Sequence, residues 1–412
     1  MIVHSDRLGP RPLALHASAL WRAQVLALSA AATGGNRYLD AQPAGLADIQ
    51  TYGMAAKLAL LAATQAETAS RWSAFWRGVG LYRSHPYRRR MEDRQTALQV
   101  GRSRLLAVEP GDNDPSHSRP PCARSPILMI PSLVNSSDVL DLMPDRSLVE
   151  ALHAAGYAPY LVDWGDPEPD AADWPVERYL DEKLAPMLDW IIDRRRAAPV
   201  VLGYCMGGLL AAALATVRPK DVRALTLLAM PWDFHAPDPE PAKRMARFVG
   251  PFQQAARECG SVPVDLLQTL FFALDPTLAA RKFRNFAKLD QSCEAAMLFV
   301  AMEDWVNGGP DLAAPVAATV LNEWYGANAP MRGRWAVGGT PVTNRTYPGP
   351  TLIAAPTRDR IVPMDSAIGY LHGAANAELL RVDGGHVGML VGDRAETALW
   401  RPLLAWIADA DR

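Results

Sequence analysis

The 412-residue chain has a globular composition, with 49% hydrophobic and 21% charged residues. It is long enough to bury a large core in one or two domains. A formal net charge of −2 provides no general attraction to nucleic acid or anionic lipid. No apolar run is long enough for a membrane span.

The cysteines are spread widely along the chain, at Cys122, Cys205, Cys259 and Cys293. Their separation argues against a zinc site and against a disulfide framework. We therefore expect no bound metal and a reducing, cytoplasmic location.

Residues 1–95 are rich in alanine and show no alternating strand pattern, which predicts an N-terminal helical region. An early apolar run is interrupted by Arg22 and Gln24, which fits a helix better than a signal peptide. A later stretch has aromatic residues at near-helical spacing and ends in the basic residues 88–90. We expect the tryptophans of this helix to pack on the core and the arginines to face solvent. The alternative is a docking surface for a partner.

From residue 96 to residue 235 the pattern changes to short apolar runs separated by helical stretches. The segment "TALQVGRSRLLAVEPG" predicts a hairpin, and "PILMIP", "YAPYLVDWG", "PVVLGYC" and "VRALTLLAM" predict buried strands. Uniformly apolar strands that alternate with helices are typical of a mostly parallel sheet covered on both faces.

Residues 236–345 form a long, mostly helical interval before the strand pattern returns in residues 346–412. An insertion at this point predicts a helical cap over the carboxyl edge of the sheet. Open α/β sheets place their sites at this edge.

The stretch Gly203-Tyr204-Cys205-Met206-Gly207 fits the G-x-nucleophile-x-G elbow of the α/β-hydrolase fold. The glycines allow a tight turn between strand and helix, and the N-terminus of the helix favours a thiolate. The alternative for Cys205 is a small buried thiol that only packs in the core. The predicted strand, turn and helix around it favour a nucleophile.

A nucleophile needs a base, and in this fold an acid and then a histidine follow it along the chain. His386 lies in a glycine-flanked loop after the last apolar run, whereas His372 falls in a predicted helix. Asp359 directly follows a predicted strand and is the favoured acid. Asp365 suits a helix N-cap, and Asp383 suits a turn.

Two backbone N–H groups are expected to stabilise an oxyanion. One is that of Met206, directly after the nucleophile. The other comes from the turn after the "PILMIP" strand, where Leu133 and Val134 are the candidates and Leu133 is favoured. Asn135 is a candidate to brace this turn through its side chain.

Two further turns carry an aspartate next to a tryptophan, Asp163-Trp164-Gly165 and Trp232-Asp233-Phe234. Both follow predicted strands, and we expect them to have a structural role. The remaining three cysteines have no base motif nearby and are expected to have no catalytic role.

These motifs together resemble those of the polyhydroxyalkanoate synthases, most of all the short class III catalytic subunit. The resemblance covers roughly residues 96–400 and rests on "GYCMGG", "LVNSSDVLDLMPDRSLVEALHAAGY", "LVDWGDP", "AMPWDF", "MEDWV" and "RDRIVP…GGHVG". It implies that Cys205, Asp359 and His386 are the catalytic residues. The implied reaction moves 3-hydroxyacyl groups from coenzyme A to the cysteine and then to a polyester chain.

The resemblance also implies that acyl-coenzyme A is a substrate and that no further cofactor is needed. The partners it implies are a second synthase subunit or a second copy, and polyester granules. The competing hypotheses are a cysteine-dependent hydrolase of the same fold, acting on thioesters, lactones or hydroxyalkanoates, and a catalytically idle partner protein.

Two positions depart from the family pattern. Arg360 stands where a histidine usually follows the catalytic aspartate. The turn after the first core strand continues as Asn135-Ser136-Ser137-Asp138 instead of a basic or aromatic stretch, which adds an acidic residue near the expected mouth of the site.

Overall fold

A computed structural model describes residues 7–33, 54–89, 94–108, 124–166 and 174–412. Cys122 and Arg90 lie outside the described residues. The chain divides into two compact units. The first, here called the helical unit, comprises Met1–Arg88 and Phe271–Asn307, and the second, the sheet unit, comprises Arg89–Leu270 and Gly308–Arg412.

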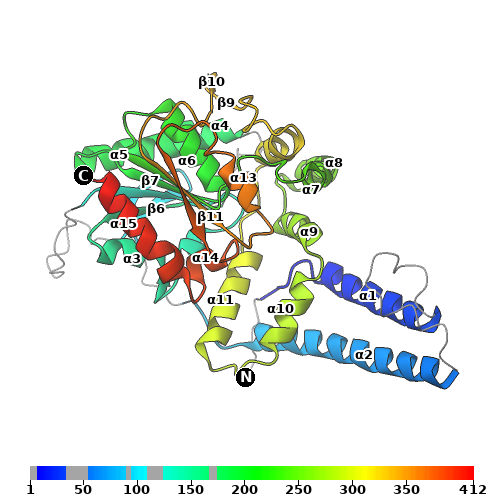
Figure 1. Ribbon diagram of the computed structural model, residues 1–412. Helices are drawn as coiled ribbons and strands as arrows, with labels where there is room; N and C mark the ends of the chain where they lie inside the picture. Colours follow the sequence, from blue (N-terminus) through cyan, green and yellow to red (C-terminus); the bar gives the residue numbers. More distant parts are fainter. Residues whose placement is uncertain (1–6, 34–53, 90–93, 109–123, 167–173) are drawn as a thin grey trace. The chain divides into compact units, whose positions relative to one another are not determined.

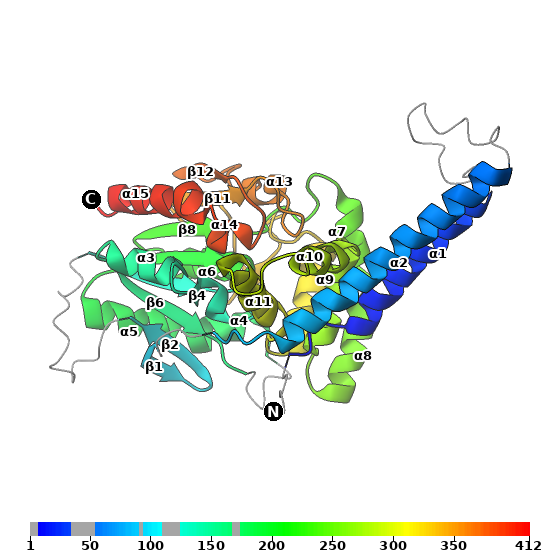
Figure 2. The same cartoon turned by 90° about the horizontal axis from the view of Figure 1, so that it is seen from below.

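The sheet unit is built on one eight-stranded sheet with the order β1-β2-β6-β3-β7-β8-β11-β12. Figure 2 shows β1 and β2 at one edge of this sheet and β11 and β12 at the other. Its strands are β1 (Gln95–Val100), β2 (Ser103–Ala107), β3 (Pro126–Ile130), β6 (Ala158–Asp163), β7 (Val200–Tyr204), β8 (Ala224–Leu228), β11 (Thr351–Pro356) and β12 (Ala377–Val382). The first two form the predicted hairpin, and β2 pairs antiparallel with β6. All other pairs are parallel. The predicted α/β-hydrolase fold is confirmed.

The central strands are apolar because both faces of the sheet are covered. Every residue of β3, β7, β8 and β11 is buried, as expected for parallel strands between two layers of helices. Figure 1 shows α5 (Ala185–Arg195) and α6 (Met206–Val217) on one face, with α3 (Leu148–Ala154) and α15 (Arg401–Ala410) on the other. The helix α6 is buried along nearly its whole length. Its many glycine and alanine residues allow it to pack closely on β7 and β8.

The remaining short elements of the sheet unit connect these layers. They are η2 (Ser137–Leu140), β4 (Asp141–Met143), β5 (Arg146–Ser147), α4 (Val176–Tyr179), η4 (Leu180–Leu184), β9 (Ala336–Val337), β10 (Thr340–Pro341), α13 (Met364–Ile368), α14 (Gly388–Val391) and η6 (Glu396–Trp400).

The insertion between β8 and β11 is mostly helical, as the sequence pattern indicated. Its helices are α7 (Pro239–Ala246), α8 (Val249–Cys259), α9 (Val264–Leu274), α10 (Leu278–Phe286), α11 (Glu294–Asn307), α12 (Ala314–Ala318) and η5 (Thr319–Gly326). Residues 271–307 of the insertion belong to the helical unit, and the rest belongs to the sheet unit. The predicted segment boundaries at residues 95, 235 and 345 stay a prediction. Each of the two compact units combines separate stretches of the chain, so the units do not test where a segment begins or ends.

The helical unit joins α1 (Leu13–Thr33) and α2 (Met54–Ser84) to α10 and α11. Its core is a cluster of aromatic and aliphatic side chains that includes Phe75, Tyr82, Phe283 and Phe286. Edge-to-face ring contacts of this kind add stability beyond the buried area. The cluster holds residues about 200 positions apart in one compact body.

The tryptophans of α2 do not pack as expected. Trp76 is 37% exposed, whereas the neighbouring Phe75 is fully buried. The face of α2 that meets α10 is made by Phe75, Gly78, Val79 and Tyr82. Trp76 lies beside this face, with its ring edge to face against Phe75. Among the described residues, no helix combines the length and the apolarity that crossing a bilayer requires.

Gly78 is the point of closest approach between α2 and α10, because a Cβ atom there would overlap the backbone oxygen of Phe283. Gly80, two residues further along the same helix, has open space around it. We expect Gly78→Ala to lower the free energy of unfolding by about 2 kcal/mol through overpacking. Gly80→Ala should raise it by about 0.5–1 kcal/mol through helix propensity. Urea unfolding of both variants checks this, and a stabilising Gly78→Ala would contradict the proposed packing.

Candidate active site

Cys205 lies at the sharp turn between β7 and α6, with φ 54° and ψ −125°. This left-handed backbone is strained for a residue with a side chain. The sheet holds it there, since the Cys205 N–H donates to Leu228 O at 2.9 Å, and Cys205 O accepts the Gly208 N–H at 2.9 Å. Gly203 and Gly207 have no room for a Cβ atom, because α6 starts directly against β7 and the end of β3. The turn is therefore the predicted nucleophile elbow.

His386 and Asp359 come together at the same edge of the sheet, from the loops after β12 and β11. His386 Nδ1 lies 2.6 Å from Asp359 Oδ2, and the side chain of Asp359 is fully buried. The other carboxylate oxygen, Asp359 Oδ1, accepts the N–H groups of Ile361 at 2.8 Å and Val362 at 3.0 Å. With both oxygens bonded, the carboxylate can orient the imidazole ring.

The charges around His386 favour its protonated form. Burial lowers the pKa of His386, but the negative charges at Cys205 and Asp359, together with hydrogen bonds to both side chains, raise the pKa to about 10. The imidazole of His386 is therefore protonated near neutral pH. The structure thus brings Cys205, His386 and Asp359 together, and their catalytic roles stay a prediction at this point.

Tyr204 supports His386 in a way that the sequence interpretation missed. Its fully buried ring lies against the imidazole, with centroids 5.2 Å apart, and its hydroxyl donates to His386 O at 3.2 Å. The only signal in the sequence was its place beside the cysteine of the elbow. The hydroxyl and the ring together fix both the backbone and the side chain of His386.

The other histidine and aspartates considered for the base and the acid do not take part in this arrangement. His372 is exposed, and its carbonyl accepts a hydrogen bond from Asn344. Asp365 lies in the first turn of α13, so the predicted N-cap role is wrong: the N-cap position is taken by Pro363. Asp383 forms ion pairs with two arginines on the surface, Arg358 and Arg394.

The turn after β3 holds the two candidate donors for an oxyanion, the Leu133 and Val134 N–H groups, and only one of them is free of other hydrogen bonds among the described residues. The Val134 N–H donates to Ser132 Oγ at 3.1 Å, so it is occupied. Among the described residues, the N–H groups of Leu133 and Met206 have no acceptor, which leaves both available to a ligand. The prediction that Asn135 braces the turn is wrong, since Asn135 Oδ1 is buried without a partner and Ser132 does the bracing.

Asp138 and Arg360, the two positions that depart from the family pattern, lie in different environments. Asp138 pairs with Arg89 at 3.1 Å and accepts from Ser136 Oγ at 3.0 Å, so its charge is compensated locally. Arg360 is exposed directly after the buried Asp359. Neither side chain replaces a hydrogen bond of the Cys205–His386–Asp359 arrangement.

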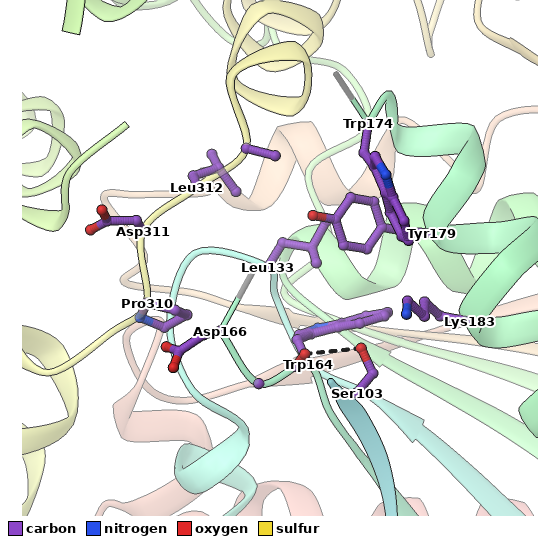
Figure 3. A pocket seen from close by; sticks show the side chains of 12 residues that line it. Ser103, Leu133, Trp164, Asp166, Trp174, Tyr179, Lys183, Pro310, Asp311 and Leu312 are labelled. Atoms are coloured by element: carbon purple, nitrogen blue, oxygen red, sulfur yellow. Dashed lines mark hydrogen bonds between the residues drawn. The ribbon is translucent and has the colours of Figure 1, made fainter. Parts of the chain in front are cut away.

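A small cavity lies beside the Leu133 side chain, which is one of its lining residues. Figure 3 shows Trp164, Trp174 and Tyr179 on one side and Pro310 to Leu312 on the other. Its volume of about 20 Å³ is enough for one water molecule and too small for an acyl chain. Cys205 is not among the residues that line it, so this cavity is not the place where an acyl group would meet the sulfur.

The first of the two aspartate turns is structural, as predicted. Asp163 Oδ1 accepts the Gly165 N–H at 3.1 Å, and Asp163 Oδ2 pairs with Arg104 at 2.5 Å. Cys259 is a free, exposed thiol, and Cys293 is a free, half-buried one that packs against the aromatic cluster of the helical unit.

Comparison with known proteins places this geometry in a family. The model of the alpha/beta hydrolase fold family matches residues 125–393, which is more than half of the chain. A solved structure of a thermophilic esterase from Thermogutta terrifontis aligns with a TM-score of 0.48 at 14% identity, over 78% of this chain and all of that chain.

Two curated relatives share more of the sequence. The chain is 28% identical to the poly(3-hydroxyalkanoate) polymerase subunit PhaC of Allochromatium vinosum, over 76% of this chain and 90% of the relative. It is 27% identical to the protein of the same name from Synechocystis, over 69% of this chain and 78% of the relative. With its sheet order, its elbow and the match over residues 125–393, the chain belongs to the alpha/beta hydrolase fold family.

Proposed function

We propose that this protein is a polyhydroxyalkanoate synthase-like acyltransferase. It moves 3-hydroxyacyl groups from coenzyme A to Cys205 and then to the hydroxyl end of a polyester chain. The observation that carries the proposal is a cysteine at the elbow, hydrogen-bonded to His386, in a chain whose relatives are named poly(3-hydroxyalkanoate) polymerases.

The first half of the reaction uses the thiolate of Cys205. It attacks the thioester carbonyl of the acyl-coenzyme A, and the oxyanion that forms accepts hydrogen bonds from the Met206 and Leu133 N–H groups. The bond between the carbonyl carbon and the coenzyme A sulfur then breaks. The imidazolium of His386 gives its proton to the departing coenzyme A thiolate, which leaves an acyl-Cys205 and a neutral histidine.

The second half uses the histidine as a base. Acylation removes the negative charge at Cys205, which is one of the causes that raise the pKa of His386. The neutral imidazole takes the proton of the incoming hydroxyl, and the resulting oxygen nucleophile attacks the acyl-cysteine. The ester bond forms, the carbon–sulfur bond breaks, and the thiolate returns beside an imidazolium.

Sulfur suits this sequence of steps. Exchange of one thioester for another is nearly balanced in free energy, so the acyl group on Cys205 stays activated for attack by an alcohol. An ester on serine would lose that activation. We propose no further cofactor, and we keep a second subunit, a second copy and polyester granules as the proposed partners.

Incubation with 3-hydroxybutyryl-coenzyme A tests the proposed function. We expect release of coenzyme A together with insoluble polyester, and Cys205→Ala should lower that release by at least about 10⁴-fold, as the loss of a nucleophile does. Release of coenzyme A with free acid alone would contradict transfer to a polyester and would favour the hydrolase alternative.

The pH dependence of Cys205 alkylation tests the proposed ion pair. Because the pKa of His386 is raised to about 10, its imidazolium persists through pH 7–9, and the alkylation rate should be nearly constant there. In His386→Gln the rate should instead rise with pH through the usual thiol range near about 8.5. Alkylation by iodoacetamide is read at each cysteine by peptide mass, with the exposed Cys259 as the reference for the reagent. A flat profile in both proteins would rule out His386 as the partner of the sulfur.

A further inference from the structure

The turn Trp232-Asp233-Phe234 begins four residues after Leu228, whose carbonyl accepts the Cys205 N–H at 2.9 Å, so it starts beside the elbow. It follows β8 and is fixed to α13, because the Asp233 N–H donates to Ser366 O at 3.0 Å. The buried Trp232 ring also meets the Tyr370 ring edge to face, with centroids 4.8 Å apart. Since α13 follows the loop that carries Asp359, the turn is tied to the acid side of the site.

The same turn clasps the end of the helical insertion. Asn328 Nδ2 donates to Asp233 Oδ1 at 2.8 Å, and Asn328 Oδ1 accepts the Phe234 N–H at 2.9 Å. Asn328 is 5% exposed and has φ 51°, a left-handed backbone that asparagine tolerates better than most residues. Its buried amide is thus bonded through both of its polar atoms, which fixes this part of the insertion against β8.

Tyr325 is the residue that this clasp holds in place. Its carbonyl lies 2.9 Å from the His235 ring nitrogen Nε2, and its ring packs edge to face on Phe234, with centroids 4.9 Å apart. Burial, and then the negative charges at Cys205 and Asp359, raise the pKa of the Tyr325 phenol. The phenol is therefore a neutral hydroxyl within electrostatic reach of the nucleophile and the acid.

The hydroxyl of Tyr325 is open to a ligand, whereas that of Tyr204 is not. The same two charges act on Tyr204, but the Tyr204 hydroxyl is bonded to His386 O. Within the described part of the chain, the Tyr325 hydroxyl has no hydrogen-bond partner, and it is not among the sealed, unpartnered polar atoms. Tyr325 itself is only half-buried.

The chemistry of the substrate indicates what this hydroxyl binds. The thioester carbonyl has its donors in the Met206 and Leu133 N–H groups, so a further donor is not needed there. The polar group of a 3-hydroxyacyl chain that is then left without a partner is its 3-hydroxyl. A phenol can both donate to and accept from an alcohol.

We propose that Tyr325 is a specificity residue whose hydroxyl binds the 3-hydroxyl of the acyl group, and that the Asp233–Asn328 clasp positions it. This inference rests on the proposed acyltransferase function. It gives the Trp232-Asp233-Phe234 turn a role beyond that of a structural turn, because the turn binds the end of the insertion that carries Tyr325.

The test compares acylation of Cys205 by 3-hydroxybutyryl-coenzyme A and by butyryl-coenzyme A, which lacks the 3-hydroxyl. Single-turnover release of coenzyme A gives kcat/KM for each, and peptide mass confirms the acyl-Cys205. We expect Tyr325→Phe to lower the ratio of kcat/KM for the hydroxylated over the plain substrate by about 10-fold, as loss of one neutral hydrogen bond does. An unchanged ratio would overturn the inference.

Tyr204→Phe is the matched control. It removes a phenol hydroxyl beside the same charges, but one that holds His386, so it should lower acylation by both substrates in parallel and leave their ratio unchanged. If wild-type Cys205 forms an acyl-enzyme with neither substrate, the proposed function fails and this inference fails with it. If wild type acylates and Tyr325→Phe keeps the ratio, only the inference fails.

The clasp is tested by Asn328→Asp, which keeps a side chain that tolerates the left-handed backbone but places a carboxylate against Asp233. We expect the same loss of substrate ratio as in Tyr325→Phe, and no further loss when both changes are combined, since both act through one hydroxyl. Additive losses in the double variant would show that Asn328 does not act through Tyr325. Thermal unfolding of each variant is measured alongside.

Discussion

The strained backbone of Cys205 is the constraint on which the site depends. A left-handed cysteine persists only if its surroundings over-determine it, and here hydrogen bonds to Leu228 and Gly208 and two glycines without room for a side chain do so. The same geometry turns the sulfur out at the edge of the sheet and leaves the Met206 N–H free at the start of α6. The burial of the central strands is thus a condition of the chemistry as well as of stability.

Electrostatics then sets what the sulfur can do. The bonded carboxylate of Asp359 orients His386. Burial lowers the pKa of the imidazole, but the charges at Cys205 and Asp359 and the hydrogen bonds to both raise it to about 10. In the proposed reaction, acylation of Cys205 removes one of the charges that favour the imidazolium. That proposal lets one histidine serve as acid in the first step and as base in the second.

The two parts of the helical insertion pack in different units of the structure. Residues 271–307 complete the aromatic core of the helical unit, while the later part returns to the sheet unit and is clasped by Asp233 and Asn328. A buried amide bonded through both its polar atoms specifies one arrangement of the chain, because any other arrangement would leave polar groups unpaired. The hydrogen bonds of Asn328 therefore fix the neighbouring Tyr325 in one position, as its proposed role requires.

The sequence by itself determined the α/β-hydrolase fold, the elbow at Cys205 and the loops that carry Asp359 and His386, because apolar periodicity, flanking glycines and chain order are local signals. Only the tertiary structure decided that Ser132 and not Asn135 braces the oxyanion turn, that Trp76 is exposed, and that Tyr204 holds His386. It also decided which parts of the insertion join which unit. The support of His386 by Tyr204 depends on a contact between residues 182 positions apart, and the placement of the insertion on one between Asp233 and Asn328, 95 positions apart. No local pattern encodes such a contact, since it exists only after the sheet has brought the two segments together.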